Sequence, residues 1–160
     1  MPHHNSLISD FLMQERIAVV GVSRSGKATA NFIYEKLKDE GHTVYAVNPN
    51  ATEINNEVVY HDIISIPGGV QAVVIATHPE VTLDIMKQCA GMGVKYVWIH
   101  RSFGQGSYNK EAAKYAKLRH INLIENGCPM MYLSPDIVHR CMKWILKSTG
   151  RNPEKQIINA

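Results

Sequence analysis

The chain has 160 residues, of which 45% are hydrophobic, and its 17 Lys and Arg against 14 Asp and Glu leave a net charge of +3. This small excess suits a local anion site and argues against a nucleic-acid-binding surface, and no apolar run is long enough to predict a membrane span. Three widely spaced cysteines indicate neither a disulfide framework nor a zinc site, so we expect one cytoplasmic domain over residues 1–160.

The first half of the chain alternates short apolar strands with an amphipathic helix. Four apolar residues at 17–20 are typical of a strand that is buried on both faces. A glycine-containing turn leads from it into a helix over 28–40, whose predicted buried face is Ala30, Ile33, Tyr34 and Leu37. In chain order, this half is expected to contain a helix at 6–14, a strand at 17–20, a helix at 28–40, and strands at 43–47 and 58–60.

The second half repeats the alternation after a Pro-Gly-Gly break at 67–69. In chain order, it is expected to contain a strand at 72–76, a helix at 81–92, a strand at 96–99, a helix at 109–119, a strand at 121–125 and a helix at 135–147. The predicted buried face of the first of these helices is Val81, Ile85, Cys89 and Met92. That of the second is Ala112, Tyr115, Ala116 and Leu118.

Strands separated by helices predict an α/β fold, a single doubly wound (Rossmann-like) parallel sheet with helices on both faces. We expect a core over about 15–131, a C-terminal helix over about 135–147 and a loose tail over 148–160. Ligands of such sheets lie beyond the carboxyl ends of the strands, where the strand order reverses. The segments predicted to converge there are 21–27, 48–49, 77–81 and 100–101.

The turn after the first strand partly matches the loop that binds nucleoside triphosphates. Gly21 and Gly26-Lys27 fit the first seven positions of that motif. The eighth position requires a hydroxyl for Mg²⁺, and Ala28 has none. The sequence therefore argues against a nucleotide triphosphatase.

The same turn partly matches the dinucleotide fingerprint G-x-G-x-x-G. Gly21 and Gly26 fit its first and third glycines, but Ser23 replaces the middle one, which lets the backbone approach a pyrophosphate. The second strand ends in Asn48-Pro49 instead of the acidic residue that holds a ribose hydroxyl. An NAD(P)-binding oxidoreductase or redox sensor remains the alternative hypothesis.

A ligand with more phosphate than NAD fits the turn better. The Ser23 hydroxyl can donate to a phosphate, and Arg24 and Lys27 add positive charge beside it. Coenzyme A carries both a diphosphate and a 3′-phosphate. From these residues alone, a Gly-Ser-rich turn with solvated cations remains the other interpretation.

The residues also resemble a known family in four places. These are Ile17–Ser23, Val47-Asn48-Pro49, Tyr96–Ile99 after a Gly-Met-Gly helix end, and Glu125–Met131. Together they resemble the small single-domain CoA-binding proteins, whose fold is similar to the CoA-binding domain of the succinyl-CoA synthetase alpha subunit. The resemblance covers about Ile17 to Met131, although many members carry Asp-Arg-Cys where this chain has Asn126-Gly127-Cys128.

The resemblance implies a protein that binds coenzyme A or an acyl-CoA without catalysis of its own, as a carrier, sensor or partner subunit. It places the CoA phosphates at the first turn, the adenosine beside Asn48-Pro49, and the pantetheine or diphosphate near Thr77, His78 and Val81. With His100 added from the predicted ligand edge, the candidate cofactor-binding residues are Gly21, Val22, Ser23, Arg24, Lys27, Asn48, Pro49, Thr77, His78, Val81 and His100.

Three side chains also invite a catalytic interpretation. His78 and His100 follow strands at the ligand edge, where a general base could act or where an imidazole could simply bond a phosphate or the loop backbone. The thiol of Cys128 could attack a thioester or exchange with a CoA disulfide, but a buried small hydrophobe is the commoner role. We assign no catalytic residue and no metal ligand.

The final helix carries more apolar surface than the sheet edge needs. His139, Arg140, Lys143 and Lys147 are predicted to occupy its polar side, while Trp144 lies off the centre of its apolar face. Covering the sheet is one interpretation of that face. Because an aromatic beyond it would stay partly exposed, we also predict a weak symmetric homodimer to which Trp144 contributes.

Overall fold

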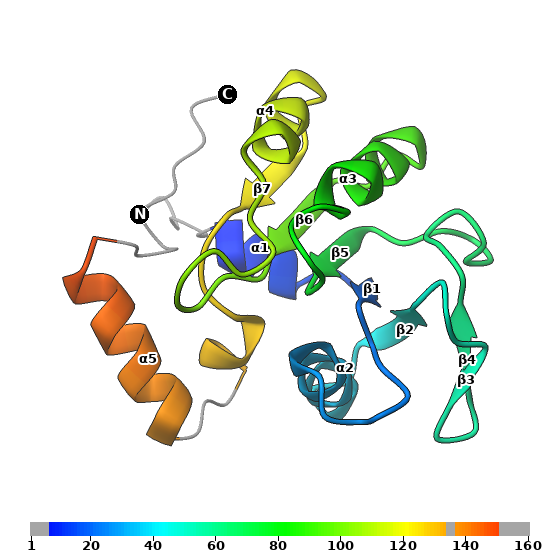
Figure 1. The fold of residues 1–160 in the computed structure, drawn as a ribbon, viewed down its shortest axis with the longest axis horizontal. Helices are drawn as coiled ribbons and strands as arrows, with labels where there is room; N and C mark the ends of the chain where they lie inside the picture. Colours follow the sequence, from blue (N-terminus) through cyan, green and yellow to red (C-terminus); the bar gives the residue numbers. More distant parts are fainter. Residues whose placement is uncertain (1–6, 134–136, 151–160) are drawn as a thin grey trace.

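In a computed structural model, residues 7–133 and 137–150 are described, and they form a seven-stranded sheet flanked by helices (Figure 1). The strands are β1 (Arg16–Val20), β2 (Thr43–Val47), β3 (Glu53–Ile54), β4 (Glu57–Tyr60), β5 (Ala72–Ile75), β6 (Tyr96–Ile99) and β7 (Asn122–Ile124). The helices are α1 (Leu7–Leu12), α2 (Thr29–Asp39), α3 (Thr82–Gly91), α4 (Lys110–Leu118), α5 (Ile137–Ser148) and the 3-10 helix η1 (Pro129–Met131).

The strand order is β3-β4-β2-β1-β5-β6-β7, with β1 at the centre. From β1 the chain adds β2 and β4 on one side, then crosses over to add β5, β6 and β7 on the other, and all of these strands pair in parallel. The order therefore reverses between β1 and β5. This confirms the predicted doubly wound sheet, to which the structure adds the two-residue antiparallel strand β3.

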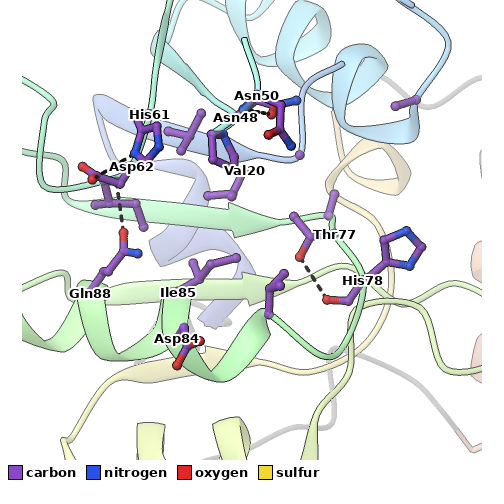
Figure 2. Close-up of a pocket in the computed structure, with 17 residues that line it drawn as sticks. Val20, Asn48, Asn50, His61, Asp62, Thr77, His78, Asp84, Ile85 and Gln88 are labelled. Atoms are coloured by element: carbon purple, nitrogen blue, oxygen red, sulfur yellow. Dashed lines mark hydrogen bonds and ion pairs between the residues drawn. The ribbon is translucent and has the colours of Figure 1, made fainter. Parts of the chain in front are cut away.

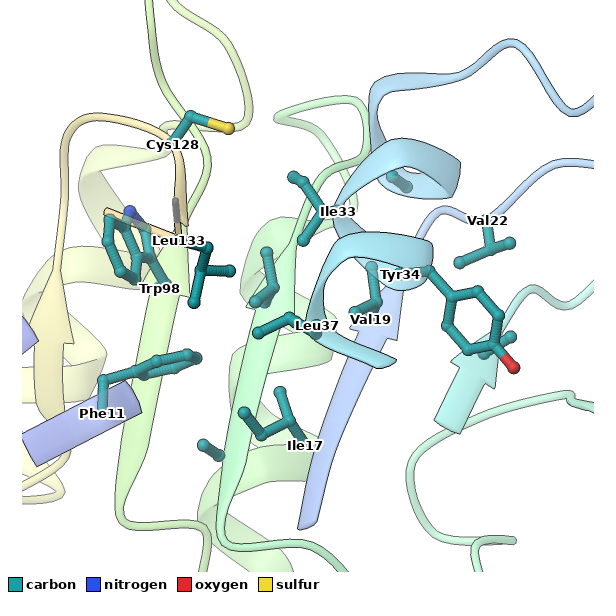
Figure 3. Packing of buried hydrophobic residues seen from close by; sticks show 14 of the residues in the cluster. Phe11, Ile17, Val19, Val22, Ile33, Tyr34, Leu37, Trp98, Cys128 and Leu133 are labelled. Carbon is teal, nitrogen blue, oxygen red and sulfur yellow. The ribbon is translucent and has the colours of Figure 1, made fainter. Parts of the chain in front are cut away.

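The alternation of side chains along each strand produces two cores, one on each face of the sheet. Ile17 and Val19 of β1 pack with α1, α2 and η1, while Ala18 and Val20 pack with α3 and α4. Figure 3 shows the first of these cores, in which α2 crosses above β1 and Trp98 of β6 lies against Phe11 of α1. Both faces carry helices, as predicted.

Trp98 anchors the first core. Its side chain is fully buried, its ring meets that of Phe11 edge to face with centroids 5.4 Å apart, and its indole N–H donates to the Asn126 carbonyl at 3.1 Å. This single residue therefore ties α1 and the segment after β7 to β6.

The connection from β4 to β5 departs from the regular pattern because residues 61–71, all of them described, contain no helix. Ile63, Ile66 and Val70 cover the sheet there instead. A crossover helix would have packed beside α3. Here the connection itself meets α3, where Ile63 N–H donates to the Gln88 side chain at 3.2 Å.

Three predicted core positions are wrong. Val81 is 46% exposed and Met92 is 39% exposed because they lie just outside α3, at its two caps, where the helical periodicity no longer directs a side chain to the sheet. Leu118 is 77% exposed because it lies about 200° around α4 from the buried Ala116. The predicted buried face of α2 is confirmed at all four positions.

The C-terminal helix forms, over Ile137–Ser148. Leu146 is buried against the first core, whereas Cys141, Trp144 and Ile145 are exposed, and Trp144 is 72% exposed as expected. The predicted start at Pro135, the tail from 151 onward and the side chains of His139, Lys143 and Lys147 lie outside the described residues. Within the described part of the chain, no helix has the length and apolar character that a bilayer span requires.

Candidate functional site

A cleft of about 700 Å³ opens where β1, β2, β4 and β5 end, beside the point where the strand order reverses (Figure 2). Of the candidate residues, those that line it are Gly21, Asn48, Pro49, Thr77, His78 and Val81. Residues outside the candidate set that line it include Ala28, Asn50, His61, Asp62, Ile63, Asp84, Ile85 and Gln88. Three of the four predicted segments therefore meet at one cleft.

The remaining candidates lie around this cleft. The Val22 side chain is fully buried in the core, so only its backbone can face a ligand. Ser23, Arg24 and Lys27 belong to the turn that borders the cleft, and the last two are exposed. His100 does not line the cleft; its carbonyl accepts a hydrogen bond from Ser107 N–H at 2.9 Å.

Gly21 permits a close approach between the ends of β1 and β5. Its φ is +109°, and a Cβ built on it would lie 2.2 Å from the Ala76 carbonyl oxygen. Its N–H donates to the Val47 carbonyl at 3.0 Å, which also ties it to the end of β2. Only glycine combines this backbone conformation with this contact.

Two asparagine side chains hold the turn after Gly21. The amide of Asn31, a buried residue of α2, accepts from Ser23 N–H at 2.9 Å and donates to the Ser23 carbonyl at 2.8 Å. The amide of Asn48 donates to the Val22 carbonyl at 2.7 Å. These bonds fix the backbone of the turn from within and leave its charged side chains directed to solvent.

The turn provides the chemistry of an anion site. Among the described residues, neither Arg24 nor Lys27 has a salt-bridge partner. The N-cap of α2 is Ala28, whose side chain cannot satisfy the first N–H groups of that helix. Unsatisfied N–H groups, the positive end of the helix dipole and two nearby cations together favour a phosphate.

A buried serine locks the loop after β5. The Ser107 hydroxyl accepts from Thr77 N–H at 3.0 Å and donates to the Thr77 carbonyl at 2.8 Å. The buried hydroxyl of Thr82 donates to the Ser107 carbonyl at 2.7 Å. The Thr77–His78 wall of the cleft is thus held by the connection between β6 and α4.

The wall of the cleft beyond β4 and along α3 carries negative charge. The Asp62 carboxylate accepts from Ser65 N–H at 2.8 Å, and this backbone hydrogen bond is the main reason that the pKa of Asp62 lies below its usual value. Asp84 is mostly exposed, with its carboxylate 3.6 Å from Lys87 Nζ. An anionic ligand group is therefore favoured at the turn and disfavoured at this wall.

The two buried thiols do not suit nucleophilic chemistry. Burial raises the pKa of Cys128 to about 12, and that side chain is 2% exposed. Burial likewise raises the pKa of Cys89 to about 12. Neither thiol forms a significant fraction of thiolate at neutral pH, and within the described chain no group of three or more His, Cys, Asp or Glu could hold a metal.

The loop after β4 escaped the sequence prediction, although a signal for it existed. His61 and Asp62 directly follow the strand that was predicted at 58–60. The rule that ligands lie beyond strand ends applies to this strand as well. Gln88 had no such signal, because its position depends on a contact with Ile63, far away in the sequence.

A doubly wound sheet with a cleft beyond its strand ends defines a nucleotide-binding class of domain. The chain belongs to the CoA binding domain family, whose pattern matches residues 15–134. This confirms the resemblance seen in the sequence.

Among curated proteins, the chain is 32% identical over 113 residues to acetate–CoA ligase (ADP-forming) II of Archaeoglobus fulgidus, a match that covers 69% of this chain and 16% of the ligase. It is 29% identical over 101 residues to the alpha subunit of acetate–CoA ligase (ADP-forming) II of Pyrococcus furiosus, covering 62% of this chain and 22% of that subunit. The chain thus spans less than a quarter of the length of these relatives.

Solved structures include a similar protein of comparable size and a match to part of a larger one. A hypothetical protein from Pyrococcus horikoshii OT3 matches with a TM-score of 0.71 and 28% identity, over 79% of this chain and 89% of that one. The dinucleotide forming acetyl-coenzyme A synthetase 1 of Ca. Korarchaeum cryptofilum, in complex with phosphate and ADP, matches with a TM-score of 0.62 and 25% identity, over 75% of this chain and 27% of that one.

Proposed function

We propose that this chain binds coenzyme A or an acyl-CoA in the cleft and catalyses no step of its own, acting as a carrier, sensor or partner subunit. The observation that carries the proposal is the cleft itself, which combines a phosphate-type turn with mostly apolar walls in a chain of the CoA binding domain family. Its volume of about 700 Å³ is typical of cofactor sites.

The distribution of charge supports one orientation of the ligand. The CoA phosphates face the turn and the start of α2, where Arg24 and Lys27 are exposed and unpaired among the described residues. The adenosine lies beside Asn48-Pro49, and the pantetheine or diphosphate lies near Thr77, His78 and Val81. The acidic wall at Asp62 and Asp84 favours uncharged parts of the ligand there.

The positions of the candidate catalytic side chains support a chain that catalyses no step of its own. Cys128 is buried with a raised pKa, and His100 does not line the cleft, which leaves His78 as the one of the three catalytic candidates that lines it. The alternative, an NAD(P)-binding oxidoreductase or redox sensor, requires a carboxylate at the end of β2. Asn48 and Pro49 stand at that position, and the carboxylates that line the cleft, Asp62 and Asp84, belong to the loop after β4 and to α3 instead.

We also infer a cytoplasmic protein that forms a weak homodimer. All three cysteines are free thiols, which suits a reducing compartment. The exposed Trp144 supports the dimer.

Mass spectrometry of small molecules released from the purified protein tests the proposed ligand. The expected result is coenzyme A or an acyl-CoA in a ratio approaching one per chain. Stoichiometric NAD or NADP in its place would contradict the proposal and favour the alternative. Protein that is purified empty would be reloaded with CoA before release, and failure to retain any would count against the proposal as well.

A further inference from the structure

The side-chain amide of Gln88 has a fixed orientation. Its Oε1 atom accepts a hydrogen bond from Ile63 N–H at 3.2 Å. Because a backbone N–H can only donate, the amide oxygen must be the atom that faces Ile63. The Nε2 amino group, which Figure 2 shows on the side of Ile85, is then left to donate toward the cleft that Gln88 lines.

Gln88 lines the cleft from the second half of α3. Ile85 and Gln88 follow one another at helical spacing along the side of α3 that faces the cleft, and Val81 lines the cleft from the N-cap of that helix. Gln88 is seven positions beyond Val81, which corresponds to about 10 Å along the helix axis. The opposite wall comes from residues 61–63, in a connection that contains no crossover helix.

Two buried isoleucines line the cleft beside this amide. Ile63 is 1% exposed and Ile85 is 8% exposed, and both line the cleft next to Gln88. Asn48 and Pro49 line the same cleft from the end of β2. A flat, uncharged group with a hydrogen-bond acceptor at its edge fits this environment best, because it buries two apolar faces and satisfies the Nε2 donor.

We propose that Gln88 is a specificity-determining residue that donates from Nε2 to a ring nitrogen of the adenine base of coenzyme A. The inference rests on the proposed function. Adenine has flat apolar faces and ring nitrogens that accept hydrogen bonds. The carboxylates of Asp62 and Asp84, which line the same wall, disfavour the phosphates at this end. The amide carbonyls of pantetheine are the competing acceptors.

The variant Gln88→Glu separates the two roles of this side chain. Its carboxylate still accepts from Ile63 N–H, so the loop after β4 keeps its anchor. The group that faces the cleft changes from a donor to an acceptor. Lys87→Gln is the matched control, because it makes the same change in net charge on the neighbouring, exposed position outside the cleft. Gln88→Met removes the Nε2 donor without adding charge, and it also removes the acceptor for Ile63 N–H.

Calorimetric titration with CoA, adenosine 3′,5′-bisphosphate and 4′-phosphopantetheine distinguishes the outcomes. In Gln88→Glu and Gln88→Met, affinity for CoA and for the adenosine bisphosphate should fall roughly tenfold to a hundredfold, while affinity for 4′-phosphopantetheine and the melting temperature of Gln88→Glu stay within error. The Lys87→Gln variant should bind all three like the original chain.

Two results would overturn the inference while leaving the proposed function intact. One is an unchanged affinity for adenosine 3′,5′-bisphosphate in both Gln88 variants. The other is a selective loss of 4′-phosphopantetheine binding, which would place pantetheine at Gln88. Failure of the unaltered chain to bind CoA would instead contradict the proposed function itself.

Discussion

The turn after β1 and the loop after β5 occupy equivalent places in the fold but are built differently. Each follows one of two neighbouring parallel strands, and each leads into a helix whose N-cap makes no side-chain hydrogen bond. The turn carries exposed cations. The loop has its backbone held at Thr77 by the buried hydroxyl of Ser107.

At this site the turn supplies the positive charge, whereas the hydrogen-bonded loop holds the shape of the cleft. The turn can lose Arg24 and Lys27 without disturbing the core, because both side chains are exposed. The loop cannot lose Ser107 without leaving two backbone groups of Thr77 unsatisfied. Changes in the turn should therefore alter ligand affinity alone, whereas changes at the loop should alter stability and affinity together.

The largest effect is expected where the turn and the loop touch. Gly21→Ala should lower the free energy of unfolding by about 3 kcal/mol or more, because it combines an unfavourable positive φ with overpacking against Ala76. Denaturant unfolding measures this. Gly26→Ala in the same turn is the control, since its φ is +70° but its Cβ would meet nothing within 4 Å, and it should cost only about 1 kcal/mol. Equal costs for the two variants would show that the contact with Ala76 is unimportant.

The next effect concerns charge. Changing both Arg24 and Lys27 to Ala should weaken CoA binding by roughly 2–4 kcal/mol, at about 1.5–3 kcal/mol for each charge-assisted hydrogen bond with allowance for non-additivity. The free energy of unfolding should not change. Titration of this double variant is compared with Lys110→Ala/Lys117→Ala, which removes the same charge from exposed positions of α4. A similar loss of CoA affinity in both double variants would show that the effect comes from net charge and not from the positions of Arg24 and Lys27.

Unlike the turn, the loop should lose stability and ligand affinity together. Ser107→Ala should lower the free energy of unfolding by about 1–3 kcal/mol, because the N–H and carbonyl of Thr77 lose their partner, and CoA affinity should fall with it. Thermal melts and titration of one preparation measure both quantities. The control is Ser102→Ala, because the hydroxyl of Ser102 contacts a side chain, His100 Nε2 at 3.4 Å, and not the backbone of Thr77. A stable Ser107→Ala protein with full affinity would contradict the comparison.

The smallest effect is expected away from both regions. Trp144→Ala should weaken a homodimer that is already weak, and should leave the monomer's stability nearly unchanged because the side chain is 72% exposed. Light scattering at several concentrations measures the change in mass. A chain that stays monomeric at high concentration would refute the predicted dimer.

The sequence predicts the parts of this structure that depend on local pattern. The strands at 43–47 and 96–99 form with the predicted bounds, since apolar runs between turn residues carry that information. Val81, Met92 and Leu118 were misplaced because helical periodicity cannot say where a helix ends or how wide its buried face is. The part of the cleft that is lined by residues 61–63 and Gln88 was not predicted from the sequence. That part depends on a connection without a helix between β4 and β5 and on the contact between Gln88 and Ile63, neither of which a local pattern shows.

The most direct measurement of the central claim is a calorimetric titration of one protein preparation with CoA, dephospho-CoA and NAD. We expect CoA to bind more tightly than dephospho-CoA by about 1.5–3 kcal/mol, the contribution of one charge-assisted hydrogen bond to the 3′-phosphate, and NAD to bind more weakly than CoA. NAD binding as tight as or tighter than CoA would contradict the account.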